Sequence, residues 1–272
     1  MNIATLGPKG TFSHEAALKH SRKSKIIFTN TIRDVFGIVA KGSADFGIVP
    51  IENSITGTVG QSLHCLIDNN LKIKSEVLLK IEHCVVGFAD SLRDIKSLYI
   101  HPQTYEQCER FIKKEIPKAR IIYTSSNGRS AEMISKSKDK TQASIVPNIA
   151  IGIYNLKVLK KNVKDNRLNI TRFFVVAKSD DGKSGFDRTS IAVYPHIDEP
   201  GVLYKIFGQF AKRGINLAKI ESRPSKAKLG RYIFYIEFDG HRTENHIIEA
   251  LKKIEEYSDV TMLGSYKRGS LN

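Results

Sequence analysis

The sequence has no tryptophan among its 272 residues and only three cysteines, Cys65, Cys84 and Cys108. The cysteines are odd in number and form no C-x-x-C pair, which argues against a disulfide scaffold or a zinc knuckle. Cys108 falls on the apolar side of an expected helix, so we expect a buried, reduced thiol there. No H-E-x-x-H pair occurs among the eight histidines, and we expect no metal.

Long hydrophobic runs are absent as well. No apolar stretch approaches the roughly 20 residues of a membrane-spanning helix, and no basic segment followed by an apolar core opens the chain. Residues 1–6 instead run directly into a strand-like pattern. We therefore expect a cytoplasmic protein that does not bind a membrane.

Negative charge is scarce relative to positive charge: 28 acidic residues face 43 lysines and arginines, a net charge of +15. The basic residues are scattered, and no stripe of them alternates with aromatic side chains as in a nucleic-acid-binding surface. We therefore expect no nucleic-acid partner. A positive field of this kind would instead attract a small polyanionic substrate.

The first 180 residues alternate short apolar runs with helix-like segments, which is typical of an α/β fold. A helix is predicted over 102–116, where apolar side chains including Cys108 and Ile112 share one face. Strands separated by helices predict right-handed βαβ units and a mostly parallel sheet. The strands are expected at 2–6, 26–28, 46–49, 97–100, 119–122 and 142–146, with one or two more between 72 and 88.

The segment 178–188 is polar, contains two glycines and has no periodicity, so we place a domain boundary there. The remainder of the chain predicts a ferredoxin-like βαββαβ module, in which two helices cover one side of a small antiparallel sheet. The expected domains are therefore 1–180 and 188–266. The elements of the module are expected at 189–195, 200–213, 215–223, 230–238, 244–256 and 259–265.

Three loops in the first domain join an apolar strand to a helix and are rich in glycine and hydroxyl residues: 6–17, 48–62 and 123–133. Such loops direct backbone N–H groups at a carboxylate or phosphate. The alternative is that their serines and threonines only cap helices. Neither the nucleoside-triphosphate loop pattern nor G-x-G-x-x-G occurs, and no serine lies in a G-x-S-x-G turn.

The segment NITRFF at 169–174 places a hydroxyl and a guanidinium at the start of a buried strand. A partly desolvated arginine needs an anionic partner. For Arg172 that partner is either an internal acid, with Asp165 close in sequence, or a substrate carboxylate held by two hydrogen bonds. Thr171 can donate a hydrogen bond to a leaving oxygen, although its pKa is too high for easy proton release.

Several segments resemble prephenate dehydratase in sequence order: GPKGTFS (7–13), PIENSITGTV (50–59), HPQTYEQC (101–108) and DNRLNITRFFVV (165–176). Residues 213–226 resemble part of an ACT domain and carry its Glu-Ser-Arg-Pro signature at 221–224. The match spans almost the whole chain. It implies a catalytic domain of two α/β lobes, like a periplasmic binding protein, followed by a regulatory ACT domain. It also implies a monofunctional enzyme, since no chorismate mutase segment precedes the first expected strand.

The resemblance implies that prephenate loses carbon dioxide and water to give phenylpyruvate, without a cofactor, in a cleft between the lobes. Decarboxylation pushes electrons toward the carbon that bears the hydroxyl, and aromatisation drives the process. Thr171 would be the hydrogen-bond donor or general acid at the leaving hydroxyl, and Arg172 would hold a carboxylate. Glu52, Asn53 and Gln107 are also implied in catalysis, and Thr11, Ser54, Ser126 and Phe173 in substrate binding.

The resemblance further implies allosteric control by L-phenylalanine, bound between paired ACT domains, and therefore a homodimer or homotetramer. Judged from the residues alone, Gly201 could simply start a helix, and Glu221 with Arg223 could form a surface ion pair. The residues implied for the effector pocket are Gly201, Val202, Leu203, Leu217, Glu221, Ser222, Arg223 and Pro224.

Two rival functions stay open at the level of sequence. Arogenate dehydratase performs the same chemistry on a substrate with an amino group in place of the keto oxygen. A non-catalytic amino-acid or anion sensor would bind its ligand without turnover. Two positions also depart from the family pattern: Ile100, where relatives often have serine, and Asn127, where threonine is common.

Overall fold

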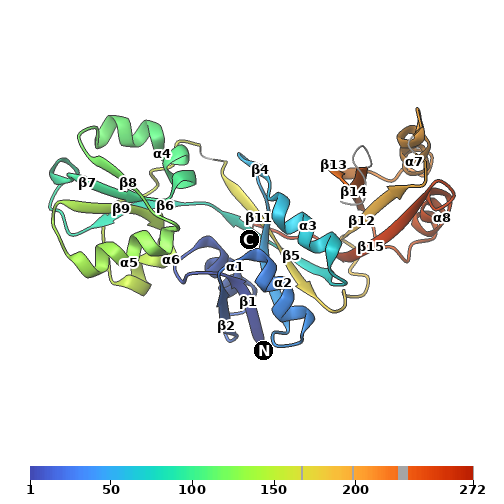
Figure 1. Cartoon of the computed structure of the whole chain (residues 1–272), viewed down its shortest axis with the longest axis horizontal. Helices are drawn as coiled ribbons and strands as arrows, with labels where there is room; N and C mark the ends of the chain where they lie inside the picture. Colours follow the sequence, from blue (N-terminus) through green and yellow to red (C-terminus); the bar gives the residue numbers. More distant parts are fainter. Residues whose placement is uncertain (167, 198, 226–231, 272) are drawn as a thin grey trace.

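The computed structural model describes residues 1–166, 168–197, 199–225 and 232–271 and shows three bodies in a row (Figure 1). A central lobe carries the N-terminus. A second lobe, within residues 83–160, lies at one end of the molecule, and the C-terminal module, drawn in orange and red, lies at the other. No helix in the described part of the chain is long and apolar enough to cross a membrane.

The elements of the three bodies follow chain order except for one strand, β11, which returns to the central lobe after the second lobe is complete. The central lobe contains β1 (Asn2–Leu6), α1 (Phe12–His20), β2 (Lys25–Thr29), α2 (Ile32–Ala40), β3 (Phe46–Asn53), β4 (Gly57–Thr58), α3 (Gly60–Asp68), β5 (Lys72–Lys80) and β11 (Ile170–Ala177). The second lobe contains β6 (His83–Gly87), the 3-10 turn η1 (Leu92–Asp94), β7 (Ser97–Ile100), α4 (Pro102–Glu115), β8 (Arg120–Tyr123), α5 (Asn127–Ser137), β9 (Gln142–Pro147), α6 (Asn148–Tyr154) and β10 (Lys157–Lys160). The C-terminal module contains β12 (Asp187–Pro195), α7 (Val202–Ala211), β13 (Leu217–Pro224), β14 (Tyr232–Asp239), α8 (Asn245–Ile254) and β15 (Ser258–Lys267).

The sheets of the first domain are mixed, so the prediction of a mostly parallel sheet is wrong. In the central lobe β1 is parallel to β2 and β3, but β11 inserts antiparallel between β3 and β5. In the second lobe β7 is parallel to β8 and β9, whereas β6 is antiparallel to β9 and β10. The antiparallel pairs arise because the chain crosses between the lobes twice, a path that helix-and-strand alternation does not reveal.

Strand β11 separates two hydrophobic cores, and its side chains alternate between them. Phe173 and Val175 pack on the side of α1, and Phe174 and Val176 pack on the side of α2 and α3. All four side chains are essentially buried. The strand is therefore apolar on both faces along most of its length. Because its side chains alternate between the faces, Thr171 and Arg172 at its polar start point to opposite sides of the sheet.

The C-terminal module has the predicted ferredoxin-like arrangement. Its four strands form an antiparallel sheet in the order β13-β14-β12-β15, and the apolar faces of α7 and α8 share one core with this sheet. Helix α7 begins after Gly201, whose φ of 88° suits glycine. The strand expected at 230–238 is present from Tyr232 onward, and residues 230 and 231 lie outside the described part of the chain.

The module is joined to the central lobe by backbone pairing as well as by the segment 178–186. Strand β15 continues the central sheet beside β5, so that one ten-stranded sheet runs through both bodies. Gly264 permits this close approach, because an added Cβ would lie 2.5 Å from the carbonyl oxygen of Ile73. The two bodies therefore share a continuous sheet, which a polar linker in the sequence does not predict.

Candidate functional site at the lobe junction

Thr171 and Asn53 are direct cross-strand neighbours where β11 begins and β3 ends, next to the segments that cross between the lobes. The Asn53 amide nitrogen donates to Thr171 Oγ1 at 2.9 Å, and the two residues are only 5% and 9% exposed. Because an amide nitrogen can only donate, the threonine oxygen accepts in this bond, and its own hydrogen can be donated elsewhere. The pair therefore presents an oriented hydroxyl donor.

The Asn53 amide is fixed at both ends. Its Oδ1 accepts from the backbone N–H groups of Ile55 at 3.0 Å and Thr56 at 3.1 Å, which closes the turn after β3. Its Nδ2 also donates to Oδ1 of Asn169 at 2.7 Å. Asn169 is fully buried. It is a site residue that the sequence patterns do not predict, although it opens the NITRFF segment.

Arg172 points to the opposite face of β11 from Thr171, so the geometry does not support the expectation that both act on one substrate. Consecutive residues of a strand face opposite sides of the sheet. The Arg172 guanidinium donates to both carboxylate oxygens of Glu237 in the C-terminal module, at 2.7 Å each, and Arg172 is 8% exposed. Its partner is therefore an internal acid, but not Asp165, which accepts from backbone N–H groups of α4.

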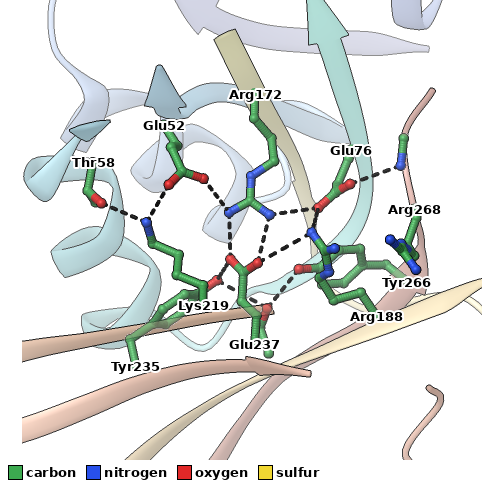
Figure 2. Close-up of polar contacts among 12 residues, drawn as sticks. Glu52, Thr58, Glu76, Arg172, Arg188, Lys219, Tyr235, Glu237, Tyr266 and Arg268 are labelled. Atoms are coloured by element: carbon green, nitrogen blue, oxygen red, sulfur yellow. Dashed lines mark hydrogen bonds and ion pairs between the residues drawn. The ribbon is translucent and has the colours of Figure 1, made fainter. Parts of the chain in front are cut away.

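Figure 2 shows the charged side chains around Arg172, which we call the Arg172 cluster. Glu76 accepts from Arg172 at 3.0 Å and lies 3.5 Å from Arg188. Glu237 also accepts from the Tyr235 hydroxyl at 2.6 Å. The carboxylates come from β3, β5 and β14, and two of the cations come from β12 and β13. The cluster consists of Glu52, Glu76, Arg172, Arg188, Lys219 and Glu237.

Glu52 belongs to this cluster and not to the Thr171 face, although it adjoins Asn53 in sequence. Its carboxylate accepts from Lys219 Nζ at 2.7 Å and lies 3.0 Å from the Arg172 guanidinium. Burial alone would raise the pKa of Glu52, but the hydrogen bond from Lys219 and the charge of Arg172 outweigh it, and the pKa is lowered. A direct catalytic role for Glu52 is thus not supported by the geometry.

Arg172 itself is held as a cation by the same balance. Burial acts to lower the pKa of its guanidinium, but the adjacent Glu237 carboxylate prevails and raises that pKa. Three carboxylates face three cations in the cluster, so the charges compensate one another. Removing one member would leave the charges of this largely buried network unbalanced.

Two of the three glycine-rich loops, 6–17 and 123–133, meet across the lobes, and the third, 48–62, contacts α4. An added Cβ on Gly128, at the start of α5, would lie 2.4 Å from the Lys9 carbonyl oxygen of the first loop. The Tyr154 hydroxyl donates to the same oxygen at 3.0 Å. The remaining loop meets α4 where Gln103 Nε2 donates to Thr56 Oγ1 at 3.4 Å. Helix N-termini from both lobes thus adjoin one another.

The hydroxyls expected to bind substrate are used within these loops. Thr11 and Ser126 cap α1 and α5, each accepting from a backbone N–H of the first helical turn. Ser54 Oγ donates to the Leu168 carbonyl at 2.8 Å and accepts from the Ile170 N–H at 3.0 Å. The capping interpretation therefore describes Thr11 and Ser126, and a contact of any of the three with substrate stays a proposal.

Gln107 and Phe173 occupy different environments. Gln107 Oε1 lies 2.8 Å from Nε2 of His83, which is fully buried and meets the Phe12 ring edge-on at 5.3 Å. Phe173 is 1% exposed and packs on the α1 side of the core. The geometry does not support the expected contact between Phe173 and substrate, because the ring is buried in the core on the α1 side of the sheet.

The C-terminal module contains a cavity of about 760 Å³ beside the start of α7. Three of the expected effector residues, Gly201, Val202 and Leu203, line it. Phe234 of β14 and Asp259 of β15 line it as well, so the wall combines apolar side chains with a carboxylate. A pocket of this size and mixed character suits a small amphipathic ligand.

The expected effector residues on β13 lie elsewhere. Glu221 accepts a 2.5 Å hydrogen bond from Thr58 of the central lobe, and the Arg223 guanidinium packs over Gly60 at the start of α3. Their distance from each other, 3.6 Å, marks an ion pair, but it lies between domains and not on the outer surface. Ser222 and Pro224 are exposed on the other side of the strand, and Leu217 packs against the module core. None of these five residues lines the cavity beside α7.

A two-lobed α/β body with a buried hydroxyl–amide pair at the lobe junction, joined to a ferredoxin-like module with its own cavity, defines a class of two-domain enzymes. The chain belongs to the prephenate dehydratase family: the family model matches residues 3–181, and the ACT domain model matches residues 196–256. The family assignment and the fold class predicted from the sequence are both confirmed.

Curated relatives and solved structures agree with this assignment. The chain is 36% identical to a prephenate dehydratase of Methanocaldococcus jannaschii, covering 95% of both chains. It is 37% identical to a bifunctional chorismate mutase/prephenate dehydratase of Aquifex aeolicus, covering all of this chain and 75% of that one. The crystal structure of an Arthrobacter aurescens prephenate dehydratase in complex with L-Phe superposes with a TM-score of 0.92 at 32% identity, covering 100% of this chain and 92% of that one. A quorum-quenching acylase shares the fold at 23% identity and a TM-score of 0.89, covering 98% of both chains.

Proposed function

We propose that the protein converts prephenate to phenylpyruvate, carbon dioxide and water, as a step of phenylalanine biosynthesis in the cytoplasm. The observation that carries the proposal is the Thr171 hydroxyl, oriented by Asn53 and able to donate its hydrogen. Family membership supplies the substrate class. The charge of the molecule supports capture of a dianion, since the net charge is +15.

The proposed reaction needs a hydrogen-bond donor placed at the leaving oxygen, and it needs no electron sink. The bond between the ring and its carboxylate breaks, and the electron pair moves through the ring toward the carbon that bears the hydroxyl. That carbon–oxygen bond breaks, and the departing hydroxide takes up one proton from solvent to leave as water. Thr171 stabilises the developing negative charge on that oxygen by hydrogen bonding, and aromatisation drives the step.

The carboxylates of the substrate are proposed to lie against the N-termini of α1 and α5. These helices begin in the loops that meet at Lys9 and Gly128, and helix N-termini favour anions through their free N–H groups and dipoles. Gln107 reaches the same region from α4, with its amide oxygen occupied by His83. Its NH₂ group is therefore the part proposed to contact substrate.

Regulation by L-phenylalanine is proposed at the cavity beside α7, because a related structure carries that ligand and Gly201 to Leu203 line the cavity here. Exposed apolar side chains on the module, among them Tyr204 and Ile197, support pairing of two modules in a homodimer or homotetramer. Of the β13 residues in the implied effector pocket, the exposed Ser222 and Pro224 would then contribute only across such a pair.

The test is turnover by the purified protein and by a Thr171→Ala variant. Wild type is expected to release phenylpyruvate from prephenate, and Thr171→Ala to lose about 100-fold or more in kcat while KM changes little, because the hydrogen bond acts in the transition state. Thr171→Ser, which keeps the hydroxyl, is the matched control and should retain most of kcat.

Three outcomes would change the proposal. Turnover of arogenate at the same rate would show that the assigned substrate is too narrow. Binding of prephenate without turnover would favour a sensor. Full activity in Thr171→Ala would remove the hydroxyl from the mechanism.

A further inference from the structure

Two adjacent cross-strand pairs connect the proposed site to the C-terminal module. Thr171 lies opposite Asn53, and Arg172 lies opposite Glu52, on the same two strands. The first pair lies at the lobe junction. The second faces the module, where Glu52 and Arg172 meet Lys219 and Glu237 (Figure 2). Arg172 follows Thr171 in the chain, and Glu52 precedes Asn53. Because the two pairs are covalently connected in this way, a displacement on one face of the sheet moves the residues on the other.

We propose that Arg172 is a positioning residue that couples the C-terminal module to the Asn53–Thr171 pair through its ion pair with Glu237. This inference rests on the proposed function of Thr171. It replaces the substrate-carboxylate role expected for Arg172, since its guanidinium is 5.2 Å from the Phe174 ring and is enclosed by carboxylates on the module side.

The bond to Glu237 has the geometry needed to transmit a displacement. Both nitrogens of the guanidinium fork donate to the two oxygens of one carboxylate at 2.7 Å, a planar arrangement that resists both sliding and rotation. Glu237 is fully buried and is itself held by the Tyr235 hydroxyl at 2.6 Å. Neither partner can therefore move far without the other.

The same strand of the module reaches the cavity. Tyr232 and Phe234 of β14 line the cavity beside α7, whereas Tyr235 and Glu237 face the central lobe. A ligand that displaces β14 from the cavity side therefore displaces Glu237 on the cluster side. This is a direct physical path between the two proposed ligand sites, with a shared rigid strand as the moving element.

A second set of contacts joins the module to the turn after Asn53. Lys219 Nζ donates to Glu52 at 2.7 Å and to the Thr58 hydroxyl at 2.8 Å. Thr58 in turn donates to Glu221 at 2.5 Å. These contacts place β13 against β3 and β4. Since Arg172 of β11 is bonded to Glu237, both strands that hold the hydroxyl–amide pair, β3 and β11, contact the module.

The cluster has room to rearrange. A cavity of about 260 Å³ lies beside it, lined by Arg172, Arg188 and Glu237 among others. The Nε atoms of both arginines are buried without a hydrogen-bond partner in the described part of the chain. A cluster with unused donors beside free volume can adopt a second arrangement at modest cost, which a population shift requires.

Two variants test the coupling by removing one charge each from the Arg172 cluster. Glu237→Gln breaks the two-bond pair with Arg172. Arg188→Gln is the matched control, because Arg188 lies 3.6 Å from Glu237 and 3.5 Å from Glu76 but has no polar contact with β3 or β11 among the described residues. Both variants are expected to unfold at lower temperature, since each leaves the charges of the cluster unbalanced.

Activity is expected to separate the two variants. Glu237→Gln should lower kcat for prephenate about tenfold with KM changed less than about threefold, and it should reduce the response to L-phenylalanine. Arg188→Gln should keep kcat within about twofold of wild type. Arg172→Lys should resemble Glu237→Gln, because an ammonium cannot make both bonds.

The coupling is overturned if folded Glu237→Gln keeps wild-type kcat and phenylalanine response, or if both variants lose kcat equally. A silent Glu237→Gln beside an inactive Thr171→Ala would overturn only the coupling and leave the proposed function intact. Amide hydrogen exchange supplies a readout independent of turnover: Glu237→Gln should speed exchange in residues 53–58 and 170–174, and Arg188→Gln should not. Unchanged exchange in both variants would also contradict the proposal.

Discussion

His83 is an uncharged histidine enclosed at the start of β6, with no exposed surface. Burial lowers the pKa of its imidazole to about 4, and the positive charge of Lys164 acts in the same direction, against the hydrogen bond with Gln107. The neutral ring is therefore the form that fits the fold. In the unfolded chain the pKa returns to about 6.5.

Acid should therefore destabilise the protein through His83. Because the folded pKa lies below the unfolded one, the unfolded chain binds the proton first, and stability is lost as the pH falls from about 6.5 toward about 4. Between about pH 7.5 and about pH 5 the loss from this residue is about 2 kcal/mol. Urea unfolding of wild type and His83→Gln at both pH values measures it.

In this experiment the variant should lose about 2 kcal/mol less than wild type over the same pH interval. His246→Gln, at an exposed position of α8, is the matched control and should follow wild type. Equal slopes for wild type and His83→Gln would show that His83 is not the titrating group.

The sequence predicts that Thr171 lies at the start of a buried strand. It predicts that Arg172 points the other way, but not which residue Arg172 contacts. Residues 171 and 172 adjoin in a strand, so the period of two already predicts opposite faces. The sequence does not contain the identity of the partner, because Glu237 lies 65 residues away in another domain. The same holds for Asn53, which meets Thr171 across 118 residues.

At the scale of secondary structure, Gly264 of β15 is a close-packed joint between the two domains. Its φ is 149°, and an added Cβ would approach the carbonyl oxygen and nitrogen of Ile73 to 2.5 and 2.9 Å. Backbone atoms of a central strand cannot move aside cheaply. A side chain at this position would therefore separate β15 from β5.

Gly264→Ala is expected to lower the free energy of unfolding by about 3 kcal/mol or to split unfolding into two transitions. Gly208→Ala in α7 is the matched control: nothing lies within 4 Å of its Cβ position, and alanine favours a helix by about 0.5–1 kcal/mol. Urea unfolding followed by circular dichroism compares them. Similar stabilities for the two variants would show that the joint tolerates a side chain.

Strand and helix positions agree closely with the periodicity, whereas strand directions do not. The expected run 142–146 corresponds to β9 with one extra residue, 46–49 is only the first half of β3, and 72–88 holds both β5 and β6. The pattern does not predict strand direction, because a central strand such as β11 is apolar on both faces whichever way it runs. Its insertion between β3 and β5 depends on contacts across the whole first domain.

At the scale of the whole molecule, the two cavities lie on opposite sides of one sheet in the C-terminal module. The larger is beside α7, and the smaller adjoins the Arg172 cluster at the boundary with the central lobe. A sequence can indicate the residues around the first, since Gly201 to Leu203 are contiguous. The second is lined by strands of both domains that lie far apart in the chain, so no local pattern predicts it.

The larger cavity makes a prediction about the intact protein. A ligand that binds only the folded state raises stability by RT ln(1 + [L]/Kd), which is about 2.7 kcal/mol at 100 times Kd. L-phenylalanine at 100 times Kd should therefore raise Tm by roughly 5 °C, as measured by differential scanning fluorimetry. Leu203→Trp should remove most of that rise, because the indole occupies space that the ligand needs.

Lys212→Ala, at the opposite end of α7, is the matched control and should retain the full rise, because Lys212 does not line the cavity. The pair of variants also distinguishes two locations for the effector. A Tm rise that survives in Leu203→Trp but disappears in Ser222→Ala would place the ligand at β13, where only a second copy of the chain could complete its enclosure. Loss in Leu203→Trp alone would locate it within one module, on the strand that carries Glu237, and would connect effector binding to the Arg172 cluster by the shortest path in the fold.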